Sequence, residues 1–330
     1  MDNKITKKRL GVLFSYDWIY LIGIILLSCF GMSFIYGFLS IKPVSGQVFN
    51  YYYDYEVSST ADESFAYLYR NIFSYDVRSV EKTALTQQEA ENILTAKLEN
   101  GEGNVIFTHT NGKTTEQGYY QCRAHDIIDY RSAYPIDDEK GGVLYELKEY
   151  LSKFLIEQGN DPLDYNNLSE QKIADNFNNR TAKHRIYKND LRNGIICVED
   201  EYERIKSLCE EAKFFQKVLQ YDKTLPANES IFYRYVKYTQ ASFEGDKMNL
   251  EAYKELLSEQ TERPYALRLN VLNGGKNVSD YFKMKDANLK GGVVMILFDL
   301  SSKNTDLMFE SVTFFNMVIR NFSDIAEKIN

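Results

Sequence analysis

The sequence contains few of the residues that usually build metal and catalytic sites. It has three histidines and four cysteines among 330 residues. His125 follows Cys122 at a short interval, but a strand through both would place the two side chains on opposite faces, and no second pair of ligands accompanies them. The motifs G-x-S-x-G and H-E-x-x-H and the P-loop are absent. We therefore expect no metal, no cofactor and no catalytic activity.

The cysteines do not suggest a disulfide framework. Cys29 lies within a long apolar run, which leaves Cys122, Cys197 and Cys209 in the rest of the chain. Three cysteines cannot all pair internally, and a domain of this size does not need covalent cross-links. A single bridge between Cys197 and Cys209 remains open at this point.

Acidic residues outnumber basic ones, which limits the kinds of partner that the chain can bind. Asp and Glu total 47, whereas Lys and Arg total 39. Residues 1–39 hold four basic and two acidic groups, so the net charge of the remainder is near −10. Such a chain is a poor match for nucleic acid or for an anionic lipid surface. We expect no nucleic-acid partner.

One apolar run dominates the N-terminal part of the chain. It begins at Trp18, ends at Leu39 and contains no formal charge. At about 1.5 Å per residue, a helix of this length would be about 33 Å long, enough to cross a hydrocarbon core of about 30 Å. Four basic residues precede the run and only Lys42 follows closely. The positive-inside rule therefore predicts a single-pass signal-anchor in the cell membrane, with residues 1–17 as a cytoplasmic basic tail and the chain from residue 40 outside the cytoplasm.

Two other interpretations of the run would change the localisation. A cleaved signal peptide has a shorter apolar core that ends in small residues, and the sequence IYGFLSIKPVSG lacks such an end. Residues 26–29 loosely match the lipobox of bacterial lipoproteins. There, however, Cys begins the mature chain and polar residues follow, whereas here Phe30 and Met32 continue the apolar run. The uncleaved anchor is therefore the preferred interpretation.

Residues 40–160 alternate between strand-like and helix-like segments, which is typical of an α/β lobe. Thr60 with Glu63 and Thr86 with Glu89 form capping boxes that mark two helix starts. The pattern predicts strands at residues 48–57, 76–85, 105–107 and 119–130, the third of them buried and parallel, and helices at residues 60–73, 87–99 and 143–158.

Residues 161–330 have more helical than strand-like segments. A polar, Asn-rich stretch at 161–193 marks an exposed insert or a crossing point between lobes. Apolar residues then recur at steps of three and four, and the run VVMILF is strand-like. We expect helices at residues 199–221, 230–242, 250–259 and 305–330 and a strand at residues 293–298. The predicted fold class is thus α/β, with a first α/β lobe at 40–160 and a helix-rich second lobe at 161–330.

The segment AENILTAKLENGEGNVIF, residues 90–107, resembles the helix, glycine turn and strand in the first lobe of bacterial extracellular solute-binding proteins. This family commonly has Asp at the position of Asn104. The resemblance implies two α/β lobes that close over a ligand without catalysis. Gram-positive members of the family are usually lipid-anchored, whereas this chain is expected to keep its transmembrane helix.

If the resemblance holds, ligands should meet the strand ends and helix N-termini that face the cleft. Each candidate residue directly follows or ends a predicted strand, and each could also be an ordinary turn or core-edge residue. The candidate ligand-binding residues are Tyr53, Tyr55, His109, Thr110, Asp299 and Ser301.

Two functions therefore remain open. The first is a membrane-anchored, bacterial, solute-binding-like module that binds a small molecule or peptide and serves a transporter or a sensor. The second is an interaction or assembly subunit of a cell-envelope complex. A deep cleft lined by Tyr and a few polar groups would favour the first function, and an exposed apolar patch would favour the second.

Overall fold

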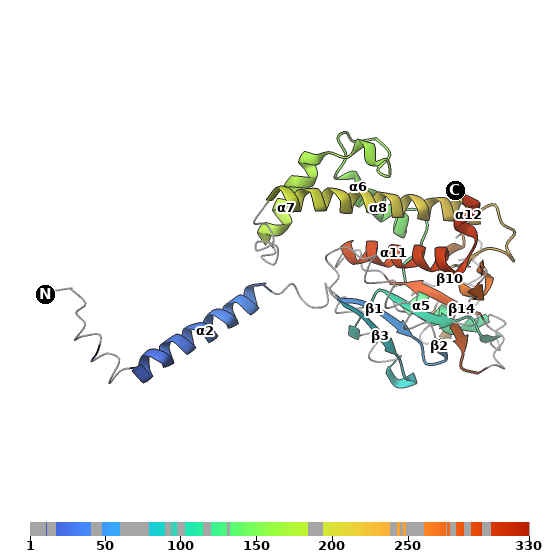
Figure 1. Ribbon diagram of the computed structural model, residues 1–330. Helices are drawn as coiled ribbons and strands as arrows, with labels where there is room; N and C mark the ends of the chain where they lie inside the picture. Colours follow the sequence, from blue (N-terminus) through green and yellow to red (C-terminus); the bar gives the residue numbers. More distant parts are fainter. Residues whose placement is uncertain are drawn as a thin grey trace.

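The described part of the chain is a β-sheet covered by helices, joined to a separate N-terminal helix (Figure 1). The computed structural model describes residues 11, 18–40, 48–59, 79–89, 94, 96–97, 103–114, 120–130, 133–183, 194–237, 243–244, 247–248, 261–274, 276–277, 282–286, 292–298 and 305–329.

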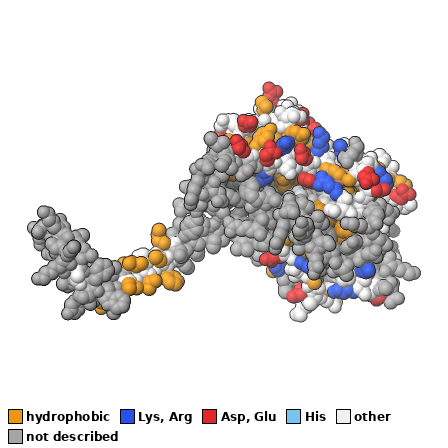
Figure 2. All heavy atoms as spheres, in the orientation of Figure 1, with side chains coloured by type: hydrophobic (Ala, Val, Ile, Leu, Met, Phe, Trp, Pro, Cys, Tyr) orange, Lys and Arg blue, Asp and Glu red, His pale blue; other side chains and the backbone are white. Residues whose placement is uncertain are grey.

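Helix α2 (Trp18–Ser40) coincides with the long apolar run. Its described side chains are largely exposed, including Leu27 and Phe30, and Figure 2 shows them as an apolar surface set apart from the rest of the molecule. Within the part of the chain whose side chains are described, which includes only some of α2, no helix is long and apolar enough to cross a membrane. A membrane-spanning role for the run stays a prediction.

The main sheet has six strands in the order β3-β1-β4-β14-β10-β7. Strand β1 is parallel to both β3 and β4, whereas β14, β10 and β7 are each antiparallel to the preceding strand in that order. The strands are β1 (Val48–Tyr53), β3 (Ser79–Ala84), β4 (Val105–His109), β7 (Phe232–Tyr235), β10 (Arg263–Arg268) and β14 (Val293–Leu297).

This topology confirms the α/β class and the parallel pairing expected in the first half of the chain. It also joins the two halves, because β4 pairs with β14 along its whole length, from Val105 opposite Leu297 to His109 opposite Val293. The described residues do not show two lobes. Strands from before and after residue 160 instead form one sheet with a continuous hydrophobic core.

Helices cover both faces of the sheet. On one face lie α6 (Val143–Ser152) and α11 (Thr305–Phe322), and the long helix α8 (Gly194–Asp222) packs on α11 (Figure 1). Helices α7 (Glu170–Lys183) and α12 (Ile325–Ile329) contact α8 from outside. The other face is covered by α5 (Arg123–Tyr130), which packs on β4.

The centre of the core is aromatic. Phe107 on β4 stacks against Tyr53 with ring centroids 5.0 Å apart and against Phe282 at 4.9 Å. Strand β4 is buried at all five positions because it lies between two other strands and has helices on both faces. That environment explains why its sequence is a continuous apolar run without the alternation of a half-exposed strand.

Short strand pairs and turns surround the main sheet. They are β2 (Val57–Ser59) with β13 (Phe282–Met284), β5 (Gly112–Thr114) with β6 (Tyr120–Cys122), β8 (Phe243–Glu244) with β9 (Lys247–Met248), β11 (Asn273–Gly274) with β12 (Lys276–Asn277), and the 3₁₀ turns η2 (Tyr165–Asn167) and η6 (Leu269–Val271).

Several expected elements have the expected type. The helix predicted at 199–221 is α8, the terminal helix divides into α11 and α12, and the strand at 293–298 is β14. The capping box at Thr86 is confirmed by reciprocal hydrogen bonds. The Thr86 amide donates to the Glu89 carboxylate at 2.8 Å, and the Glu89 amide donates to the Thr86 hydroxyl at 3.3 Å. These bonds lower the pKa of Glu89.

Two predicted elements are wrong. The strand at 119–130 is β6 followed by α5, whose apolar residues Ala124, Ile127 and Ile128 follow helical spacing and face the sheet. The helix at 230–242 contains strand β7 instead, because pairing with β10 overrides the local helical preference of this segment.

Other expectations were only partly met or are not tested. The helix at 143–158 ends at Ser152, and of the helix at 87–99 only some residues are described. The helices predicted at 60–73 and 250–259 lie outside the described residues. Cys209 is a free, buried thiol, which answers the open question of a bridge to Cys197.

Candidate functional site

The predicted site residues divide into three groups. Tyr55, His109 and Thr110 lie together at the carboxyl edge of the parallel strands, as expected. Tyr53 ends β1, but its ring is 2% exposed and belongs to the aromatic core. Because no part of that ring is open to a ligand, its role in the structure is packing. Two further candidates, Asp299 and Ser301, lie outside the described residues.

A buried ion pair occupies the carboxyl edge of β1 and β4. The Asp54 carboxylate is fully buried and accepts hydrogen bonds from the Thr108 hydroxyl and from Arg123 Nε, both at 2.9 Å. The Tyr55 amide donates to the same carboxylate at 3.0 Å. Burial is the largest single influence and lowers the pKa of Arg123, but the charge of Asp54, its hydrogen bond and the nearby charges of Asp126 and Tyr55 together raise that pKa. Asp54 thus fixes α5 to the ends of two strands.

His109 lies beside this pair at the end of β4. Its Nε2 atom is 2.6 Å from the Glu56 carboxylate, and the ring is 3% exposed. Burial lowers the pKa of His109, while the nearby charges of Glu56 and Asp54 oppose that shift. The contact therefore links the end of β4 to the turn that follows β1.

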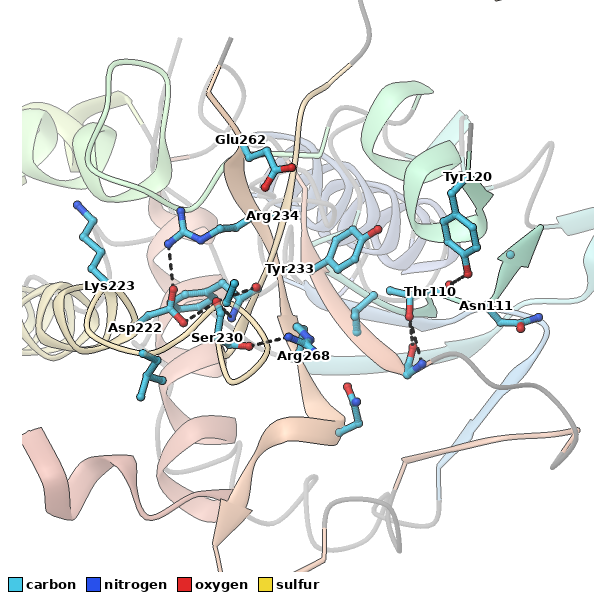
Figure 3. Close-up of a pocket in the computed structure, with 17 residues that line it drawn as sticks. Thr110, Asn111, Tyr120, Asp222, Lys223, Ser230, Tyr233, Arg234, Glu262 and Arg268 are labelled. Carbon is cyan, nitrogen blue, oxygen red and sulfur yellow. Dashed lines mark hydrogen bonds and ion pairs between the residues drawn. The ribbon is translucent and has the colours of Figure 1, made fainter. Parts of the chain in front are cut away.

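A large pocket opens next to this cluster, on the side of the antiparallel strands (Figure 3). Its volume is about 1040 Å³, in the size range of small-molecule and cofactor sites. The pocket is lined by Thr110, Asn111, Gly112, Tyr120, Asp222, Lys223, Leu225, Ala227, Ser230, Phe232, Tyr233, Arg234, Glu262, Arg268, Asn270, Gly292 and Val294.

The end of α8 and the start of β7 form one wall of the pocket. Asp222 is 2% exposed and accepts hydrogen bonds from the Ser230 hydroxyl at 2.8 Å and the Ile231 amide at 2.7 Å. Arg234 donates to the other oxygen of this carboxylate at 3.0 Å. Arg268 donates to the Ser230 carbonyl, also at 3.0 Å. The wall is thus held by a connected set of polar contacts.

Tyr233 forms another part of the lining, and α5 holds it in place. The His125 Nδ1 atom is 3.1 Å from the Tyr120 carbonyl, which can only accept a hydrogen bond, so Nδ1 carries the proton. Nε2 is then the acceptor for the Tyr233 hydroxyl at 2.6 Å. The His125 ring also stacks on Tyr235, with centroids 4.1 Å apart. Burial lowers the pKa of His125 to about 4 and raises the pKa of Tyr233.

Asn104, where the resembled family commonly has Asp, has a structural role. It is fully buried, its side-chain oxygen accepts a hydrogen bond from the Asn50 amide at 2.8 Å, and its amide group donates to the Ser311 hydroxyl at 3.4 Å. The residue therefore joins β1, β4 and α11 at the edge of the sheet opposite the pocket.

Sequence reasoning identified one side of the site and missed the other. Thr110 directly follows β4 and also lines the pocket, so the expectation that ligands meet the ends of parallel strands correctly identified one wall of the pocket. Tyr233 and Arg268 were missed because β7 was expected to be a helix and the β10 segment had no assigned structure. Among the described residues, no group of three or more potential metal ligands occurs.

Comparison with known proteins identifies no relative of this chain. No protein-family model matches the chain, and no curated protein or solved structure has a significant match to it.

Proposed function

We propose that the chain is a non-catalytic binding module that α2 anchors in a bacterial cell membrane, with the sheet domain on the extracytoplasmic side. It binds a small molecule or peptide and serves a transporter or a sensor. The observation that carries the proposal is the pocket of about 1040 Å³, which is lined by strands β7, β10 and β14 of the main sheet, the short strands β5 and β6, the end of α8 and neighbouring loops.

The lining supports ligand binding because it combines aromatic and apolar surface with a few convergent polar groups. Tyr120 and Tyr233 supply aromatic surface, and Arg268, Asn111 and Asn270 supply hydrogen-bonding groups. The polar groups are anchored on strands or on short turns directly after them, so their positions are set by the sheet.

An assembly subunit is the alternative, and its signature would be an exposed apolar patch. Outside α2, the described large hydrophobic side chains that are exposed are Tyr120 and Ile156. Tyr120 lines the pocket and Ile156 lies after α6, far from it in the chain. Two separated side chains do not make a docking surface, so the pocket is the better guide to function.

Thermal unfolding of the full chain in a non-ionic detergent tests the proposal. The panel contains amino acids, peptides, sugars, polyamines and organic anions. A ligand present at 100 times its dissociation constant should stabilise the folded state by about 2.7 kcal/mol, a readily measured shift in Tm.

A matched pair of variants shows whether the shift comes from the pocket. Ala227→Trp places a bulky ring in the lining of the pocket from an exposed position and should reduce the shift. Ala84→Trp places the same ring on β3, at the opposite edge of the sheet, and should leave it intact. No shift with any compound, or the same shift in both variants, would refute a binding role for this pocket.

A further inference from the structure

The charge of the pocket differs in sign from the charge of the chain. Lys223, Arg234 and Arg268 line it, against the two acids Asp222 and Glu262. In the whole sequence, by contrast, acidic residues outnumber basic ones by 47 to 39. A local excess of cations on an acidic protein concentrates anions at that place and repels them elsewhere.

Ion pairing within the lining neutralises one acidic and one basic residue of the pocket. Asp222 is buried and already accepts hydrogen bonds from Ser230, Ile231 and Arg234, so its charge is offset by Arg234. The pocket cations that remain are Lys223 and Arg268. Their only acidic counterpart in the lining is Glu262.

Glu262 is too far away to neutralise Arg268. It lies just before the first residue of β10, whereas Arg268 is the last residue of that strand. At about 3.3 Å per residue, the two backbone positions are about 20 Å apart, well beyond the Debye length of about 8 Å at physiological ionic strength. Lys223 lines the same pocket as Arg268, but Figure 3 shows its side chain directed away from Arg268, so it adds to the positive charge of the pocket as a whole.

The sheet places Arg268 beside an aromatic wall. Arg268 pairs with Val294, and Ala266 pairs with both Ile296 and Tyr233, so these residues share one face of the sheet. Tyr233 is therefore a diagonal neighbour of Arg268, within reach of a long side chain. Figure 3 shows the Tyr233 hydroxyl directed away from Arg268, and both side chains line the same pocket. The hydrogen bond to His125 keeps the ring in that place.

We propose that the pocket binds an organic anion whose carboxylate or phosphate group lies against the guanidinium of Arg268, with Lys223 adding charge and Tyr233 forming the adjacent wall. The structure gives Arg268 one hydrogen bond among the described residues, from Nη1 to the Ser230 carbonyl. The planar fork of its other N–H groups matches an oxyanion with two oxygens. The inference rests on the proposed binding function and specifies its ligand class.

The test uses probes that share a skeleton and differ in charge. Glutarate, glutaramide and 1,5-diaminopentane form one set, and glycerol 3-phosphate and glycerol form the other. Each is titrated into the full chain in non-ionic detergent while Tm is recorded. A shift with glutarate alone identifies a carboxylate site, and a shift with glycerol 3-phosphate alone identifies a phosphate site.

Variants assign the shift to the two cations. Arg268→Gln should raise the apparent Kd at least about tenfold, the change expected when about 1.4 kcal/mol of binding is lost. Arg320→Gln removes a guanidinium on α11 that pairs with Glu211 of α8, and it should change the Kd less than about twofold. Lys223→Gln replaces an exposed side chain and should weaken binding about threefold, with a smaller dependence on salt.

The outcomes separate this inference from the binding function itself. A shift with glutaramide, glycerol or the diamine, but with neither anion, would leave ligand binding intact and overturn the anionic class. An anion shift that persists in Arg268→Gln would also overturn the inference. If Arg268→Gln does not fold, the test rests on Lys223→Gln. An affinity for the anion and a salt dependence equal to those of the wild type would then refute the electrostatic argument.

Discussion

Acid should weaken the fold through His125, and the structure gives the size of the effect. The ring is 7% exposed, stacks on Tyr235 and accepts the hydrogen bond of the Tyr233 hydroxyl at Nε2. Protonation would place a charge among these groups and remove the acceptor. Burial accordingly lowers the pKa of His125 from its ordinary value of 6.5 to about 4.

The sign of the effect follows from the two pKa values. The unfolded chain takes up a proton at His125 as the pH falls through about 6.5, whereas the folded chain resists it down to about 4. The unfolded state is thus favoured increasingly across that range. Between pH 7 and pH 4.5 the free energy of unfolding should fall by about 2 kcal/mol from this group alone.

Urea unfolding of the full chain in non-ionic detergent at pH 7 and pH 4.5 measures the effect. Other groups titrate over the same range, so the informative quantity is the difference between the wild type and His125→Gln. The variant should be less stable at pH 7, and its loss of stability on acidification should be smaller by about 2 kcal/mol. An equal pH dependence in both proteins would refute the assignment of His125 as a buried neutral base.

Two further predictions concern the buried ion pair and the anchor. Arg123→Gln leaves the Asp54 carboxylate buried without its cation and should lower the free energy of unfolding by about 3–5 kcal/mol. The control variant Lys206→Gln, at the exposed pair with Glu203, should lower it by less than about 1 kcal/mol, and equal losses in the two variants would contradict the argument. Protease added to cells with a permeable wall should remove an epitope at Asn330 and spare one before Lys4, and a protected C-terminal epitope would contradict the proposed topology.

Local sequence patterns predicted the elements whose determinants lie within a single segment. The long helix α8 has apolar residues such as Ile205, Leu208 and Ala212 at helical spacing, and all three are buried. The Thr86 capping box needs only residues three positions apart. The parallel pairing of β1, β3 and β4 followed from strand and helix alternation, because a parallel connection needs a long crossover.

The antiparallel half of the sheet could not be predicted in this way. Strand β14 is apolar at every position, so its sequence contains no alternation that reveals which strand it joins or in which direction. Strand β7 has only four residues, and its strand state depends on β10, about thirty positions later in the chain. Both cases depend on contacts between distant segments, which a window of local residues does not contain.

The same limit explains which part of the site was found. Tyr55, His109 and Thr110 follow parallel strands, and a general rule places ligands at such strand ends. No corresponding rule applies to Arg268 and Tyr233, which become neighbours only through the register of β10 with β7. Basic and aromatic side chains in isolation are common on protein surfaces, so only the register could identify this pair.

The direction of β1 relates the pocket to the proposed anchor. Helix α2 ends at Ser40, and β1 starts at Val48 and runs for six residues (Figure 1). At about 3.3 Å per residue, the carboxyl end of β1 lies about 20 Å beyond the edge where the chain enters the sheet. Thr110 follows β4, which is parallel to β1, and therefore lies at that far edge. If α2 crosses the membrane, this wall of the pocket lies at the end of the sheet that is farther from the tether.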